Sequence, residues 1–169
     1  KEDFSEEAYF DVIRKKTAAL FKVSSQSGAV SVGAVQEEVM KAGLLGEMIG
    51  IAFQIKDDIF DYFESSELGK PTGNDMLEGK LTLPALYVLN QTGDDSLKQT
   101  ALKIRSLEAS KEEIANFVET VKEKGGIEYA TRMMYEFRDK ALALVPASAD
   151  SSLKEALTAY IDYVIERNK

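Results

Sequence analysis

Three aspartates stand close together in FQIKDDIFDYF, the stretch that covers residues 53 to 63. Asp57 and Asp61 are four residues apart, so on a helix they project from one face, with Asp58 beside them. Two carboxylates about 6 Å apart repel each other by roughly 3 kcal/mol at an effective dielectric constant near 20, so the group needs a counter-charge. Mg2+ prefers oxygen ligands and is commonly held by one or two carboxylates together with substrate phosphate oxygens. The spacing therefore predicts a magnesium site at Asp57, Asp58 and Asp61.

The sequence that follows adds positive charges to this acidic group. Lys70 lies in GKP, Asp75 follows it, and Lys80 lies in EGK, all within a long irregular stretch over residues 65 to 81. Lysine is a common point-charge partner of phosphate, and the neighbouring glycines let the backbone bend close to a ligand. Each lysine alone could equally serve solubility on the surface. Together with the aspartates, the two lysines favour a site for a magnesium-chelated phosphate or diphosphate.

An acidic face exposed to solvent is the alternative interpretation of the aspartates. A shuffled chain of this composition would contain DDxxD with an expectation of roughly 0.05, so the motif alone carries some risk of a chance match. The lysines of the loop that follows, rather than the motif itself, favour the binding site.

Helical periodicity runs through nearly the whole chain and predicts an all-α protein, a helical bundle. A first helix is expected from about Ser5 to Gln26, with Tyr9 on its apolar faces, and a long, mostly apolar helix from about Ser31 to Glu64 should lie at the centre of the bundle. Further helices are expected at 83 to 91, 96 to 106, 111 to 124, 127 to 144 and 152 to 167.

Several polar residues mark where these helices should begin. Ser110 with Glu113 and Ser152 with Glu155 have the spacing of capping boxes. Asp94 and Asp95 stand in a turn after Gly93, and this pair is expected to cap the helix that follows. These starts agree with the periodicity and support the helix assignments.

The central helix contains Gly43, Gly46 and Gly50, although glycine costs up to about 1 kcal/mol in a helix interior. Something must compensate for this cost. One interpretation is close packing of two helices through small side chains. The other is that the missing side chains leave room for the tail of a substrate.

Composition limits the possible functions. The chain has 169 residues and a formal net charge of -8, so we expect one compact unit and no nucleic-acid partner. Cysteine and histidine are both absent, which excludes thiolate chemistry and the usual general base and agrees with a cytoplasmic protein. No apolar run reaches the length of about 18 residues that a transmembrane helix needs. The remaining chemistry must use carboxylates, lysines and bound ions.

The stretch FQIKDDIFDYFESSELGKPTGNDMLEGKLTLP resembles the second aspartate-rich region of the trans-isoprenyl diphosphate synthases. Its continuation, GKPTGNDMLEGKLTLPALYVL, is most similar to the long-chain polyprenyl diphosphate synthases. IRKKTAALF contains the Lys-Thr pair found in that family, here Lys16 and Thr17, and the ending YIDYVIERNK is similar to the family's C-terminus. The resemblance thus extends over the chain and implies part of the isoprenoid synthase fold.

The resemblance assigns roles to residues that match the family's motifs. It implies magnesium ligands at Asp57, Asp58 and Asp61, diphosphate-binding residues at Lys16, Lys70, Lys80 and Asp75, and catalytic residues at Lys16, Thr17 and Gln54.

The implied reaction elongates an allylic prenyl diphosphate with isopentenyl diphosphate by 1'-4 condensation. Ionisation of the allylic diphosphate creates a carbocation and a diphosphate leaving group, so cations that stabilise the developing negative charge do most of the work. Neither histidine nor cysteine is required. This chemistry fits the residues that the chain contains.

One departure from the family is serious, because no other DDxxD occurs in the 169 residues. The chain resembles the C-terminal half of a synthase, so we expect half of the metal site and little or no activity by itself. Its helices should then need a partner, either as a homodimer or by pairing with the missing N-terminal half. A non-catalytic regulatory subunit or binding module of a prenyl synthase, and a plain acidic helical bundle, are the alternatives.

Overall fold

The computed structural model describes residues 4–63 and 72–166, and every regular element in these two ranges is helical. The expected all-α class is confirmed. The elements in chain order are α1 (Glu6–Ile13), the π-helix η1 (Arg14–Ala18), α2 (Ala19–Ser31), α3 (Gln36–Phe60), α4 (Asn74–Leu77), α5 (Leu83–Thr92), α6 (Asp95–Arg105), α7 (Lys111–Glu123), α8 (Gly126–Ala143) and α9 (Ser151–Glu166).

The chain divides into two compact units. The first comprises Lys1–Tyr9 with Asp57–Thr131, and the second comprises Phe10–Lys56 with Arg132–Asn168. The described helices of both units are too short or too polar to cross a lipid bilayer.

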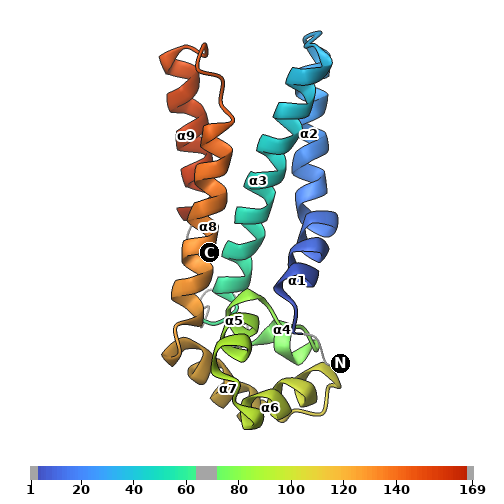
Figure 1. Ribbon diagram of the computed structural model, residues 1–169, viewed down its shortest axis with the longest axis vertical. Helices are drawn as coiled ribbons and strands as arrows, with labels where there is room; N and C mark the ends of the chain where they lie inside the picture. Colours follow the sequence, from blue (N-terminus) through green and yellow to red (C-terminus); the bar gives the residue numbers. More distant parts are fainter. Residues whose placement is uncertain (1–3, 64–71, 167–169) are drawn as a thin grey trace. The chain divides into compact units, whose positions relative to one another are not determined.

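Four helices of the first unit, α4 to α7, pack against one another around a shared core (Figure 1). Contacts join α7 to α4, α5 and α6, and α4 also contacts α6. Burial of large apolar side chains stabilises this unit. Those that are almost fully buried include Leu83, Leu86, Leu89, Ile104, Phe117, Val118 and Val121.

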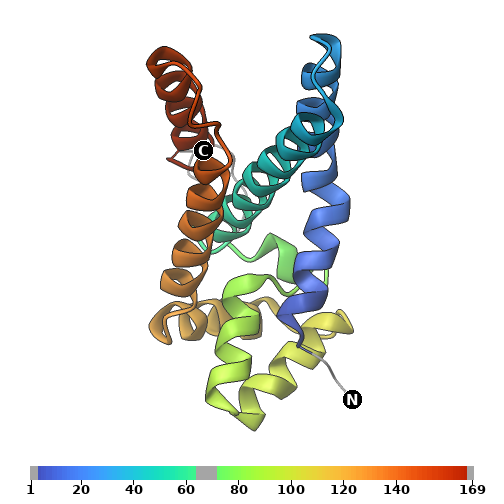
Figure 2. The same ribbon diagram turned by 45° about the horizontal axis from the view of Figure 1, so that its top comes forward.

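In the second unit α2 lies beside α3, and α8 lies beside α9 (Figures 1 and 2). A Cβ added at Gly46 would lie 2.5 Å from the carbonyl oxygen of Phe21, and one added at Gly50 would lie 2.6 Å from Cα of Ala18. At Gly43 it would meet the side chain of Gln26 at 2.7 Å. These glycines therefore serve close packing of α3 against η1 and α2, and these two segments already fill the space beside them. The first of the two interpretations is confirmed.

Two predicted helix boundaries are wrong. The first helix continues past Gln26 to Ser31 and is interrupted by η1, which the periodicity did not indicate. The second begins at Gln36 rather than near Ser31, because Gly33 adopts a φ of +73° in the turn between the helices. Its predicted end at Glu64 lies outside the described residues.

The predicted helix starts have mixed outcomes. The capping box of Ser110 and Glu113 is confirmed, and of the pair Asp94 and Asp95 it is Asp94 that caps α6, while Asp95 is the first residue of that helix. The box of Ser152 and Glu155 is wrong, because Oδ1 of Asp150 accepts hydrogen bonds from the Leu153 amide at 2.8 Å and the Ser152 hydroxyl at 2.7 Å. Asp150 is the earlier residue and a good cap, so the helix begins one residue sooner than expected.

Candidate functional site

The residues assigned to the site belong to both units, and each group is described by itself. The first unit holds Asp57, Asp58, Asp61, Asp75 and Lys80, and the second holds Lys16, Thr17 and Gln54. Lys70 lies outside the described residues.

Asp58 is directed into the interior of the first unit. Its side chain belongs to a residue that is only 4% exposed, and its Oδ2 accepts a hydrogen bond of 2.5 Å from the hydroxyl of Tyr9. Burial, followed by the charge of Asp58, raises the pKa of Tyr9 well above its ordinary value. Tyr9 therefore stays protonated, and its hydroxyl donates a hydrogen bond to Asp58. This bond ties the start of α1 to the end of α3.

Asp61 shapes the chain that follows the helix. Its backbone carbonyl accepts a hydrogen bond from the Gly73 amide at 2.8 Å, and its two carboxylate oxygens accept the amides of Asn74 and Asp75, each at 3.0 Å. Gly73 itself has a φ of +79°, a conformation that favours glycine. Three bonds from one residue thus hold the start of α4 against the end of α3.

Asp75 and Lys80 lie together at α4. The Lys80 amide donates to the carbonyl of Asp75 at 2.8 Å, and its ammonium lies 4.0 Å from Oδ1 of Asp75. Lys80 also forms a short ion pair with Glu78, and that hydrogen bond is the main cause of the raised pKa of Lys80. The sequence prediction placed these two residues at one site, and the structure brings them together beside Asp61.

In the second unit, η1 carries Lys16 and Thr17. The hydroxyl of Thr17 donates to Oε1 of Gln54 on α3 at 2.6 Å. π-helical turns are rare and occur frequently at functional sites. The structure therefore joins two of the three residues that the resemblance assigned to catalysis.

The carboxylates of the first unit could supply only part of the coordination shell of a metal ion, so other ligands would have to complete it. Across the described part of the chain, no three acidic side chains converge closely enough to hold a metal ion alone. A carboxylate offers about four lone-pair sites, and the Asp61 carboxylate accepts the amides of Asn74 and Asp75. Magnesium commonly uses one or two carboxylates and completes its shell with water and phosphate oxygens. The donor set therefore fits Mg2+ held jointly with a diphosphate.

Sequence reasoning missed the role of Tyr9, which it placed only on an apolar face. Tyr9 is 9% exposed, as that placement requires, but its hydroxyl reaches Asp58. A buried tyrosine usually finds a hydrogen-bond partner for its hydroxyl, so the sequence indicated that Tyr9 needs a partner but not which one, because Asp58 is 49 residues away.

The helical architecture is that of the isoprenyl diphosphate synthases. The crystal structure of geranylgeranyl pyrophosphate synthase from Bacteroides thetaiotaomicron is similar with a TM-score of 0.93 and 56% identity, over 99% of this chain and 55% of that one. A polyprenyl synthase from Caulobacter crescentus CB15, complexed with calcium and isoprenyl diphosphate, is similar with a TM-score of 0.85 and 30% identity, over 99% and 52% of the chains.

Sequence comparison identifies the family. The model of the family described as "Polyprenyl synthetase" matches residues 1–121, so the chain belongs to this family, and the resemblance of residues 53 to 84 is confirmed. A short chain isoprenyl diphosphate synthase of Methanothermobacter thermautotrophicus is 33% identical over 168 residues, which are 98% of this chain and 50% of that protein. The chain thus spans about half the length of the curated relatives that it matches.

Proposed function

We propose that the chain supplies the second magnesium-diphosphate site of an enzyme that elongates an allylic prenyl diphosphate with isopentenyl diphosphate. One observation carries the proposal: Asp61 binds the first amides of α4 and so brings Asp75 and Lys80 next to the aspartate motif. A carboxylate, that of Asp75, and an ammonium group, that of Lys80, then lie beside the aspartate motif. The similar structure that contains calcium and isoprenyl diphosphate supports the same chemistry.

The residues divide the work between them. Magnesium, when bound, supplies positive charge that stabilises the departing diphosphate. In our proposal Asp57 and Asp61 are its principal protein ligands, and Asp58 supports them from the interior through its bond to Tyr9. Lys80 attracts diphosphate oxygens as a point charge, and we assign the same role to Lys16 and Lys70.

Thr17 and Gln54 have a different task in this proposal. Their mutual hydrogen bond fixes both side-chain dipoles before the substrate arrives. Preorganised dipoles stabilise charge that develops in a transition state, because they need not reorient. We therefore assign these two side chains to the reacting carbon, where the allylic cation forms.

We further propose that the active protein contains a partner, either a second copy or the other half of the length found in relatives. Large apolar side chains on the second unit support this proposal, because exposed apolar patches mark interaction surfaces. Four of them follow one another along the start of the chain: Val12, Leu20, Val23 and Val30, each more than half exposed.

A non-catalytic regulatory subunit or binding module is the second candidate. The observation that favours it is that, within the described residues, no three acidic side chains converge to hold a metal ion by themselves. In that case the chain would keep the fold and bind a diphosphate without supporting elongation.

Thermal unfolding with Mg2+ and inorganic diphosphate tests the binding site. We expect the melting temperature to rise by roughly 5–10 °C at a diphosphate concentration about 100 times Kd. Asp57→Asn should remove this rise. Asp95→Asn, a change at an exposed aspartate of α6, should keep it. An unchanged melting temperature in the unaltered chain would refute the diphosphate site.

Complementation separates the two candidates. The chain is mixed with the N-terminal half of a family synthase, and elongation of a radiolabelled allylic diphosphate is measured. Elongation that requires Asp57 supports the catalytic role. Diphosphate binding without elongation in any such mixture would instead favour the binding module.

A further inference from the structure

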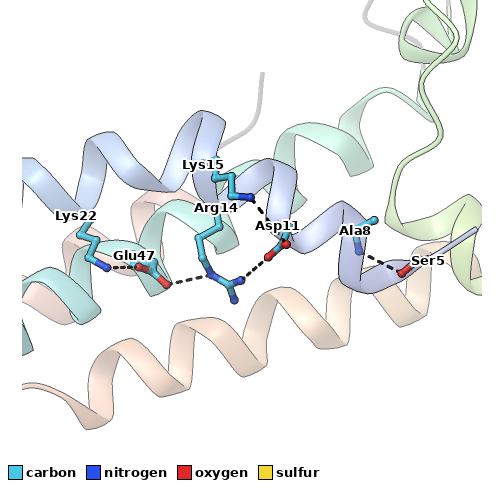
Figure 3. Close-up of polar contacts among 7 residues, drawn as sticks. All are labelled: Ser5, Ala8, Asp11, Arg14, Lys15, Lys22 and Glu47. Carbon is cyan, nitrogen blue, oxygen red and sulfur yellow. Dashed lines mark hydrogen bonds and ion pairs between the residues drawn. The ribbon is translucent and has the colours of Figure 1, made fainter.

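Glu47 is a buried carboxylate on α3 that two cations neutralise. It is 8% exposed, and its Oε1 accepts a hydrogen bond from Nε of Arg14 at 3.1 Å while its Oε2 accepts one from Nζ of Lys22 at 2.8 Å (Figure 3). A buried carboxylate is tolerated only when partners compensate for its desolvation. Here each oxygen has its own cation, and both cations come from the helical segment packed against α3.

The π turn separates the two cations along the chain. Arg14 is the first residue of η1, and Lys22 lies in α2. In a regular α-helix, residues eight positions apart point in directions that differ by about 80°. A π turn absorbs one extra residue, so the directions of Arg14 and Lys22 differ by only about 20°. Both cations can therefore meet one carboxylate because the turn is π-helical.

The same face of α3 contacts η1 at two further points. Gly50 and Gln54 follow Glu47 by three and seven residues, which is the spacing of one helix face. Gly50 leaves room for the backbone of Ala18, and Gln54 accepts the hydroxyl of Thr17. Three residues of α3, namely Glu47, Gly50 and Gln54, thus contact the π turn, and Glu47 makes the charged contact.

We propose that Glu47 is a positioning residue that fixes the π turn in register and thereby orients Lys16 and Thr17. An α-helical register would rotate Lys22 away from Glu47 and leave the buried carboxylate with one cation. The ion pairs therefore select the π turn over the regular helix. The part of this inference that concerns the diphosphate rests on the proposed function, because it uses the roles assigned there to Lys16 and Thr17.

Amide hydrogen exchange on the 169-residue chain tests the structural step. The Ala19 amide donates to the Arg14 carbonyl and closes the π turn, so it reports the register directly. We expect Glu47→Gln to accelerate exchange of the Ala19 amide by at least about tenfold and to shift the side-chain amide resonance of Gln54. Glu37→Gln is the matched control on the same helix, because Glu37 pairs only with exposed Lys41 among the ion pairs described for it.

A second variant guards against loss of folding. Arg14→Gln keeps the pair of Glu47 and Lys22 but removes the cation at the start of the π turn, and we expect the same changes at Ala19 and Gln54. Wild-type exchange in both variants would overturn the proposal. So would accelerated exchange spread evenly over α2 and α3, because that pattern indicates a general loss of stability.

Calorimetric titration with Mg2+ and inorganic diphosphate tests the functional step. Glu47→Gln should weaken diphosphate binding by about tenfold, since displaced side chains lose much of their contribution, while Glu37→Gln should bind as the unaltered chain does. Faster exchange with unchanged affinity would reduce Glu47 to a structural role and overturn the positioning claim. Absence of binding in the unaltered chain would refute the proposed function instead, and the exchange data would still decide whether Glu47 sets the register.

Discussion

Asp58 and Asp61, two of the neighbouring aspartates, are each held by hydrogen bonds within the protein. Asp58 accepts the hydroxyl of Tyr9 in the interior, and Asp61 accepts two backbone amides at α4. Their charges are therefore stabilised partly by hydrogen bonds and need not all be balanced by metal. At the residue scale, the motif holds the start of α4 in place, and in our proposal it also supplies the metal ligands.

The bond between Tyr9 and Asp58 should contribute measurably to stability. Hydrogen bonds to charged groups contribute about 1.5–3 kcal/mol, so Tyr9→Phe should lower the free energy of unfolding by about that amount in urea denaturation. Tyr163→Phe is the control, because Tyr163 is 72% exposed. Equal losses in the two variants would show that the buried hydroxyl contributes nothing special.

At the scale of the elements, stability depends on how the helices begin and on how they contact one another. The capping box of α7 is reinforced by Lys103, whose ammonium lies 2.6 Å from Oε1 of Glu113. Hydrogen bonds lower the pKa of Glu113 from 4.5 to about 2. The bond from Lys103 has the largest effect, and those with Ser110 follow. A lowered pKa means that folding favours the charged carboxylate, so the start of α7 is sensitive to acid.

The pH dependence of α7 follows from this pKa. The stabilisation is fully present above pH 4.5, the ordinary pKa of Glu113, and is lost as the pH falls through about 2. Carboxyl NMR titration should find Glu113 ionised well below pH 4.5, and Lys103→Met should move its pKa back toward the ordinary value. An identical titration in the variant would contradict the assigned cause.

Two glycines on the adjoining helices α2 and α3 should respond oppositely to alanine. A Cβ at Gly50 would lie 2.6 Å from Cα of Ala18, so Gly50→Ala should destabilise the protein by about 1–3 kcal/mol through overpacking. Gly28 has no neighbour within 4 Å of such a Cβ, so Gly28→Ala should stabilise it by up to about 1 kcal/mol. Thermal unfolding measures both changes. Stabilisation by Gly50→Ala would contradict the close approach of the helices.

Periodicity and capping residues predicted most of the helices, but they could not predict η1. A π turn forms when tertiary contacts favour one extra residue in a turn, and the partners that favour it, such as Glu47, are distant in sequence. The same reason explains the start of α9, where Asp150 and Ser152 were both plausible caps and local geometry selected Asp150. The family resemblance assigned both Thr17 and Gln54 to catalysis, but it did not predict their hydrogen bond, because spacing alone does not join residues 37 apart.

At the scale of the whole molecule, the net charge of -8 opposes the binding of any anion. A diphosphate approaches a chain with 29 acidic and 21 basic residues, and the aspartate motif adds local repulsion. Lysines alone must overcome this field when metal is absent. In our proposal, magnesium would reverse the local balance, because it would add two positive charges where the carboxylates and the diphosphate meet.

Removal of metal should therefore weaken diphosphate binding strongly. We expect the calorimetric affinity for inorganic diphosphate to fall by at least about tenfold when EDTA replaces Mg2+, because a tenfold change corresponds to only 1.4 kcal/mol of lost attraction. Sodium chloride at matched ionic strength is the control, since screening alone also reduces repulsion and should not restore the affinity. Diphosphate that binds equally well with EDTA would show that lysines hold it without metal, and the aspartate motif would then have a purely structural role at the junction of α3 and α4.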